Sequence, residues 1–168
     1  MAHPEKLNFE EILMQNKEQI YRVCRIYAKS PLEPKDLFQE TVYELWKSFT
    51  SFKGNSNIST WIYRITLNVC IRSKEKSDRK NHLISSLDSI QITPADAPID
   101  HEKQEKHDAL LSCISKLEES NKQITILYLE KLPYKEIAEI TGISENHVAV
   151  KMKRIRQILL KCITKKLD

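Results

Sequence analysis

Apolar residues recur at helical spacing through the N-terminal part of the chain. A first run extends from Phe9 to Tyr27 and predicts an amphipathic helix. It stops before Pro31 and Pro34, since two prolines in four residues end a helix. A second run begins at Asp36, which can cap a helix. The apolar positions of this second helix are Leu37, Phe38, Val42, Leu45, Trp46 and Phe49.

The stretch from Thr50 to Thr60 has no such period and is predicted to be a loop. Glycine, asparagine and serine dominate it, and these residues turn the chain or compete for backbone hydrogen bonds. A third helix is expected from Ser59 or Thr60. It is apolar through Cys70 and then becomes rich in lysine and arginine.

The pattern changes again between residues 82 and 98, where prolines and serines appear without a helical period. This segment is predicted to be a linker. Helical periodicity resumes near Asp100 or His101 and breaks around Ser120-Asn121. Another helix is expected from Ile124 to Leu132.

Residues 132–160 predict a helix-turn-helix with a cationic second helix. Gly142 ends the first helix, since glycine adopts a left-handed turn at little cost, and Ser144 can cap the second. The positions of that second helix that share an inward face are Val148, Met152, Ile155 and Leu159. Such a helix typically enters the major groove of DNA. A helical hairpin with a solvated basic face is the alternative.

Composition favours an all-α fold. Only 2 glycines and 6 prolines occur among 168 residues, and sheets need more turns than this. We expect two small helical domains, 1–81 and 109–168. Residues 82–108 then form a flexible acidic linker and the start of the next helix. A single continuous bundle is the alternative.

The distribution of charge separates these parts. Residues 1–81 hold 14 basic and 10 acidic residues, 82–108 hold 2 and 6, and 109–168 hold 11 and 7. Both domains can therefore bind a polyanion, whereas the segment between them would be repelled by one.

Several classes of protein are not indicated. No apolar run approaches the roughly 20 residues of a membrane span, and the N-terminus is too polar for a signal peptide, so a cytoplasmic location is expected. Wide separation argues against disulfides or zinc and favours buried, reduced thiols at Cys24, Cys70, Cys113 and Cys162. No catalytic set, metal-ligand spacing or phosphate-binding glycine loop emerges. We expect no enzyme activity, no cofactor, no metal and no small-molecule substrate.

Two segments together resemble a known family. The segment from Asp36 to Ile71, DLFQETVYELWKSFTSFKGNSNISTWIYRITLNVCI, resembles the promoter-melting region of sigma-70-type initiation factors. The segment from Leu132 to Leu160 resembles their C-terminal DNA-reading region. Because the chain has no room for the extra domains of housekeeping members, it is similar to the extracytoplasmic-function (ECF) subgroup.

The resemblance implies a docking surface for RNA polymerase. In this family, the helix that bears Asp36, Gln39 and Glu40 docks on the largest subunits of core RNA polymerase. From the residues alone, Asp36 can simply cap its helix, and Gln39 and Glu40 can be solvated.

The resemblance also implies that the loop captures single-stranded DNA of the minus-10 element. A flipped base needs an aromatic or apolar wall with amide and hydroxyl groups, which here are Phe52, Asn55, Ser56, Asn57 and Ser59. Trp61 is a nearby aromatic residue, although it can equally belong to the core. The candidates for gripping backbone phosphates are Arg64, Asn68, Arg72 and Lys74.

In the C-terminal region the resemblance implies recognition of the minus-35 element in the major groove. The candidates for base or near-base contacts are Asn146, His147, Lys151 and Arg154, and those for phosphates are Lys135, Lys153 and Arg156. Ala149 and Val150 depart from the polar residues that relatives often carry there. They offer only apolar contact, for example to a thymine methyl group. The resemblance thus predicts where DNA is read better than which sequence is read.

The expected function is that of a dissociable initiation factor that binds core RNA polymerase and directs it to promoter DNA. The family further implies control by an anti-sigma factor, commonly membrane-bound. A helix-turn-helix regulator that binds duplex DNA without polymerase is the alternative, and a protein-interaction module is a third hypothesis. The aromatic and amide loop argues against a duplex-only regulator, which needs no pocket for a single strand.

Overall fold

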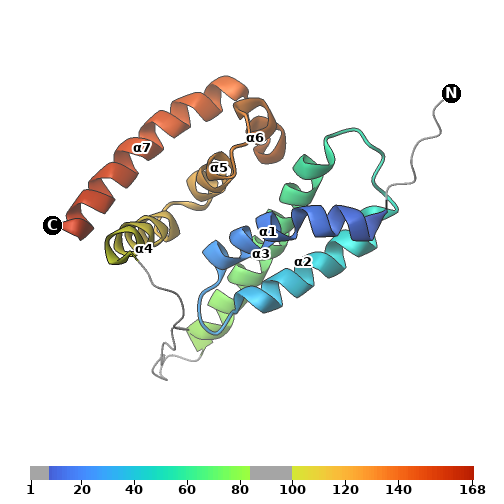
Figure 1. Cartoon of the computed structure of the whole chain (residues 1–168), viewed down its shortest axis with the longest axis horizontal. Helices are drawn as coiled ribbons and strands as arrows, with labels where there is room; N and C mark the ends of the chain where they lie inside the picture. The colour runs from blue at the N-terminus through green and yellow to red at the C-terminus, as the bar shows by residue number, and fades with distance from the viewer. Residues whose placement is uncertain (1–7, 84–99) are drawn as a thin grey trace. The chain divides into compact units, whose positions relative to one another are not determined.

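A computed structural model describes residues 8–83 and 100–168, which form seven helices and no strand (Figure 1). The predicted all-α fold is therefore confirmed. The chain divides into two compact units, Met1–Ser86 and Leu87–Asp168. Apart from residues 82 and 83, the predicted linker lies outside the described residues. Among the described helices, none is long and apolar enough to cross a membrane.

The first unit is a bundle of three helices, α1 (Phe9–Tyr27), α2 (Pro34–Phe49) and α3 (Ile58–Leu83), each of which packs on the other two. The bounds of α1 are those that the sequence predicted. Apolar side chains from all three helices fill the core, among them Ile20, Leu37 and Leu67. Removing these side chains from water is the main driving force for the packing.

Two predictions about α2 were wrong. Asp36 does not cap the helix, because α2 begins at Pro34 with Glu33 as its N-cap residue. Proline suits the first helical position, and Asp36 lies in the first turn, where a carboxylate interacts favourably with the helix dipole. Trp46 does not belong to the apolar side, since it is 62% exposed while its neighbour Leu45 is buried.

The loop between α2 and α3 is shorter than predicted. α3 already begins at Ile58, because the Asn57 side-chain oxygen accepts a hydrogen bond from the Ser59 backbone N–H at 3.2 Å and so caps the helix. Gly54 has a φ of 71°, the left-handed conformation that suits a turn glycine. Ser59 and Thr60 are therefore helical, and Thr60 is buried.

The second unit contains α4 (His101–Ser115), α5 (Glu119–Leu129), α6 (Tyr134–Thr141) and α7 (Glu145–Leu167). The predicted start of α4 is confirmed. The predicted break at Ser120-Asn121 was wrong, since these two residues lie in the first turn of α5 and the break falls at residues 116–118. α5 also ends earlier than expected, at Leu129.

The predicted helix-turn-helix is confirmed as α6 and α7. Gly142 has a φ of 76°, and its N–H donates to the Ala138 carbonyl oxygen at 2.9 Å, which closes α6. The Ser144 hydroxyl accepts from the His147 backbone N–H at 3.1 Å and caps α7. Three of the four predicted inward residues of α7 are buried, and Leu159 is half-buried.

The prediction for the cysteines was half wrong. Cys24 and Cys70 are free and buried, as expected. Cys113 of α4 and Cys162 of α7 instead form a disulfide, across a sequence separation of 49 residues. Spacing along the chain carries no information on which two helices pack side by side, and that packing decides which thiols can meet.

Candidate nucleic-acid interface

A row of aromatic side chains lies along the loop that joins α2 to α3. The ring centroids of Phe52 and Trp61 are 5.1 Å apart, and Trp61 also lies 6.4 Å from Phe49. Phe52 and Trp61 are both half-buried, so each keeps part of its ring at the surface. Trp61 thus supports the loop and still presents aromatic surface beside it, which is the kind of wall on which a nucleic-acid base stacks.

Polar groups of the predicted kinds lie in the same stretch of chain, between Phe52 and Trp61. Asn55 is exposed, and Ser56 and Ser59 are half-buried. The Asn57 side-chain oxygen already accepts the Ser59 N–H, so the donor of its amide group is what Asn57 can offer to a base. The loop therefore combines aromatic surface with amide and hydroxyl groups within a short stretch of chain.

One face of α3 continues from the loop. Trp61, Arg64, Asn68 and Arg72 follow at steps of three or four residues, so they share this face. Asn68 and Arg72 line a groove of about 380 Å³ together with Glu44 and Ser48 of α2. Lys74 is half-buried and lies on the far side of the helix, since about 3.6 residues make one turn. The structure thus aligns three of the four predicted phosphate contacts and separates Lys74 from them.

On the exposed side of α2 we define the α2 face as Asp36, Gln39, Glu40, Tyr43 and Trp46; the exposed Lys47 lies on the same side. All five side chains are exposed, and the rings of Tyr43 and Trp46 lie 6.4 Å apart. The Glu40 carboxylate accepts a hydrogen bond from the Ser73 hydroxyl of α3 at 3.1 Å. This contact fixes Glu40 at the edge of a face that is acidic at one end and aromatic at the other.

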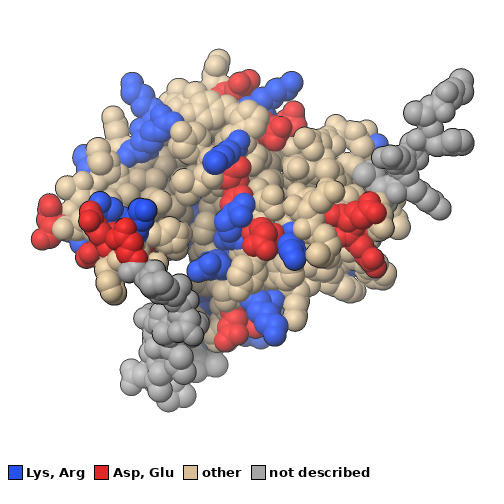
Figure 2. All heavy atoms as spheres, viewed as in Figure 1, with Lys and Arg blue, Asp and Glu red and all other residues tan. Residues whose placement is uncertain are grey.

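In the second unit, the outward face of α7 carries Asn146, His147, Lys153 and Arg154, all of them exposed. Val150 lies among them and is 50% exposed, while Lys135 is exposed on α6. Lysine and arginine side chains stand out over the surface that α7 occupies (Figure 2). The face therefore combines hydrogen-bonding groups, positive charge and one apolar contact, as readout in a major groove requires.

Two of the α7 residues predicted to contact DNA form hydrogen bonds to α5. The Lys151 ammonium group donates to the Ser120 hydroxyl at 3.1 Å and to the Asn121 side-chain oxygen at 3.4 Å. Arg156 donates to the Tyr128 hydroxyl at 2.8 Å and lies over that ring, 5.1 Å from its centroid. Lys151 and Arg156 thus tie the two ends of α5 to α7. The hydrogen bond to Tyr128 raises the pKa of Arg156 above its usual value.

Each of the two units matches a model of a known protein family. A family model described as Sigma-70 region 2 matches residues 12–80, and one described as Sigma-70, region 4 matches residues 107–159. RNA polymerase sigma factor YlaC of Bacillus subtilis is 31% identical over 134 residues, which cover 78% of each chain. The chain belongs to the sigma-70 family. It is a transcription initiation factor that directs RNA polymerase to promoters.

Longer matches place this sigma factor in the ECF subgroup. ECF RNA polymerase sigma factor SigW of Bacillus subtilis is 26% identical over 166 residues, covering 91% of this chain and 87% of SigW. The fold is similar to that of the sigma factor RpoE from Bartonella quintana, solved in complex with the anti-sigma factor NepR. The TM-score is 0.73 at 19% identity, covering 93% of this chain and 96% of RpoE. The fold is also similar to that of CnrH, solved in complex with the cytosolic domain of CnrY. The TM-score is 0.68 at 16% identity, covering 94% of this chain and 88% of CnrH.

Sequence reasoning missed several groups at these surfaces. Tyr43 and Trp46 follow Gln39 at steps of four and three residues, so helical periodicity alone places them on the exposed face of α2. The partners of Lys151 and Arg156 on α5 carry no such signal. Their sequence separations of about 30 residues are bridged only once the helices of region 4 have packed.

Proposed function

We propose that this sigma factor docks on core RNA polymerase through the α2 face. Support comes from the geometry, since five exposed side chains share one side of a helix whose other side contributes Leu37, Thr41 and Leu45 to the core. Large exposed aromatic residues such as Trp46 are typical of protein contacts, in which they supply much of the binding energy. This observation carries the proposal for docking.

We further propose that the loop and the adjoining face of α3 hold the minus-10 element as a single strand. A base extruded from the duplex would stack beside Phe52 and Trp61, and Asn55 and Ser56 would meet its polar edge. Arg64, Asn68 and Arg72 would follow the backbone along α3. The protein needs no catalysis of its own, since capturing the extruded base offsets the few kcal/mol that flipping costs.

For the minus-35 element we propose readout by Asn146, His147 and Arg154, with Lys153 and Lys135 on phosphates. Lys151 and Arg156 instead hold α7 in place through their hydrogen bonds to α5. Val150 offers the apolar contact for a thymine methyl group. Specificity in this scheme rests on few polar contacts to bases, because Ala149 adds none.

An anti-sigma factor is the further partner that we propose. RpoE, whose fold this chain shares, was solved in complex with the anti-sigma factor NepR. A regulator that covers the α2 face or the outward face of α7 would block polymerase or promoter DNA. We also propose a cytoplasmic location, where polymerase and promoters are found.

Trp46→Ala tests the docking proposal. Trp46 is 62% exposed, so its loss should leave folding intact while weakening binding to bacterial core polymerase at least tenfold. Met14→Ala is the control, because Met14 is also a large apolar residue and its exposure of 61% on α1 matches that of Trp46. Binding is measured with labelled sigma factor and purified core at low salt. Equal affinity of all three proteins, or no binding by the folded wild type, would overturn the proposal.

A further inference from the structure

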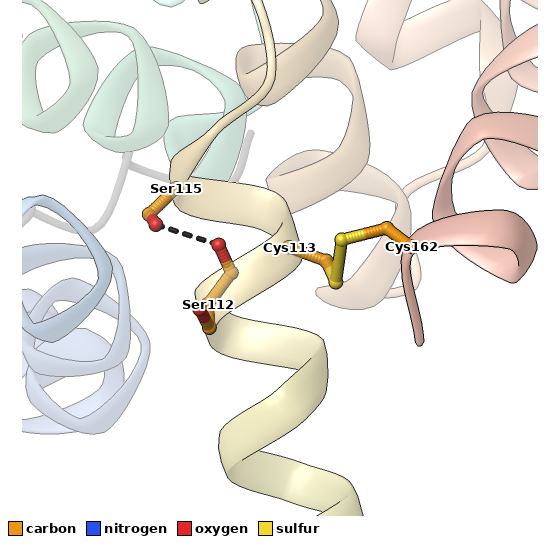
Figure 3. Close-up of a disulfide and its surroundings, with 4 residues drawn as sticks. All are labelled: Ser112, Cys113, Ser115 and Cys162. Atoms are coloured by element: carbon orange, nitrogen blue, oxygen red, sulfur yellow. Dashed lines mark hydrogen bonds between the residues drawn. A yellow bond between two sulfur atoms is a disulfide. The ribbon is translucent and has the colours of Figure 1, made fainter. Parts of the chain in front are cut away.

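The disulfide of the second unit links α4 to α7, so the chain between the two cysteines forms a covalent ring that includes the helix-turn-helix. Cys113 lies in the last turn of α4 and Cys162 near the end of α7, with their Cα atoms 6.0 Å apart (Figure 3). The two cysteines are 49 positions apart in the sequence, and the segment between them contains all of α5 and α6 and most of α7. Every residue proposed to contact the minus-35 element therefore lies inside the ring.

The four cysteines differ in access to solvent. Cys24 and Cys70 are fully buried in the first unit, where the Cys70 thiol donates a hydrogen bond to the Cys24 sulfur at 3.9 Å and no disulfide joins them. Cys113 is 2% exposed, whereas Cys162 is half-buried. The Cys162 sulfur is thus the one that a small thiol or disulfide in solution reaches first, and access is a main determinant of which cysteine exchanges.

We propose that Cys113 and Cys162 form a redox-modification site at which thiol–disulfide exchange with a low-molecular-weight disulfide clamps α4 to α7. Proteins of the reducing cytoplasm rarely keep disulfides. A disulfide in such a protein is usually transient and serves catalysis or redox sensing. The proposal goes beyond recruitment of polymerase, because it concerns control of region 4 by the redox state of its surroundings.

The Cys113–Cys162 disulfide would form in two thiol–disulfide exchange steps. The Cys162 thiolate attacks one sulfur of the small disulfide, forming a mixed disulfide and releasing one thiol. The Cys113 thiolate then attacks the Cys162 sulfur, which releases the second thiol and closes the ring. Two protein thiols are oxidised and one small disulfide is reduced to two thiols. Excess small thiol reverses both steps.

The physical effect of the switch is on the stability of the second unit. Closing a ring of this length removes much of the conformational freedom of the unfolded segment. For a unit of this size the oxidised form should melt roughly 10–20 °C above the reduced form. In the reduced form α4 and the end of α7 are held by packing alone, so the DNA-reading helices open more readily.

Thermal unfolding of the full chain tests the proposal without any substitution. Both tryptophans, Trp46 and Trp61, lie in the first unit, so tryptophan fluorescence reports that unit while far-ultraviolet circular dichroism reports both. Dithiothreitol should lower the melting temperature of the second unit seen by circular dichroism and leave the fluorescence transition unchanged. Oxidised glutathione should restore the melting temperature that the second unit had before reduction. Alkylation followed by mass spectrometry should then count two free thiols instead of four.

Cys162→Ala supplies the matched control. This variant retains Cys24 and Cys70 but has no ring, so its melting should not respond to dithiothreitol. A response in the variant would assign the effect to the first unit and overturn the proposal. The proposal also fails if the wild type melts alike in both redox states, or if oxidised glutathione leaves four free thiols. None of these readouts depends on polymerase or DNA.

Discussion

The rings of Phe52 and Trp61 lie with their centroids 5.1 Å apart and their planes 48° apart, where the loop of region 2 meets α3. The pair joins the loop to the first turn of α3. The Trp61 ring also contacts the Phe49 ring of α2, with centroids 6.4 Å apart. Phe52 is therefore packed against a residue of the helix, and in the proposed role this preorganisation would lower the entropic cost of capturing a base.

Replacing Phe52 with alanine should weaken capture of the minus-10 strand. Stacking of one base on an aromatic ring contributes about 1–3 kcal/mol, so holoenzyme should bind a single-stranded minus-10 oligonucleotide about 5- to 150-fold more weakly. Tyr21→Ala is the control, since Tyr21 is an exposed aromatic residue of α1 outside the loop. Fluorescence anisotropy measures both. Comparable losses in the two variants would refute a specific role for the loop.

Arg154→Ala should weaken recognition of the minus-35 element by about 1–3 kcal/mol and relax sequence preference at one base pair. Lys161→Ala removes the same charge from an exposed position further along α7, so it controls for charge alone. Competition binding against single-base variants of the promoter measures the preference. A uniform loss on every sequence would make Arg154 a phosphate contact instead of a base contact.

Lys151→Met should behave differently from Arg154→Ala, because Lys151 is bonded to Ser120 and Asn121 of α5. Methionine keeps most of the aliphatic stem and removes the ammonium donor. The free energy of unfolding should fall by about 0.5–1 kcal/mol, a value reduced for the partial exposure of the site. Urea denaturation measures this loss. A change in base preference without a change in stability would contradict the structural role of Lys151.

Gly142→Ala should destabilise the second unit by about 1–2 kcal/mol, because alanine rarely adopts the left-handed conformation that Gly142 has. No atom lies within 4 Å of where its Cβ would be, so the cost comes from the backbone and not from a clash. Gly142→Asn should cost less, since asparagine tolerates this conformation. Equal melting temperatures for wild type, Ala and Asn would contradict this account of the turn.

The parts of the fold that the sequence predicted are those with local signals. Prolines and turn residues mark the end of α1, and Gly142 with Ser144 marks the turn between α6 and α7, because their effects act within one helical turn. The sequence prediction started α2 too late, because Glu33, Pro34 and Asp36 are all acceptable near a helix N-terminus. The helix starts at Pro34, since proline suits the first helical position.

The parts of the site that could not be predicted depend on tertiary packing. Which cations of α7 are bonded to α5 depends on the positions of Tyr128 and Ser120, far away in sequence. The Cys113–Cys162 disulfide has the same origin. Trp46 is a different case, because its place on the α2 face followed from helical periodicity and was obscured by its apolar character.

Promoter-specific initiation by reconstituted holoenzyme tests the central claim most directly. The purified chain is added to bacterial core polymerase on a promoter that the holoenzyme selects from genomic DNA, and permanganate reactivity of unpaired thymines is measured in the minus-10 region. We expect unpaired thymines and a discrete transcript only when the chain and core are both present. Binding of the chain to duplex promoter DNA without any opening or transcript in the presence of core would contradict the account.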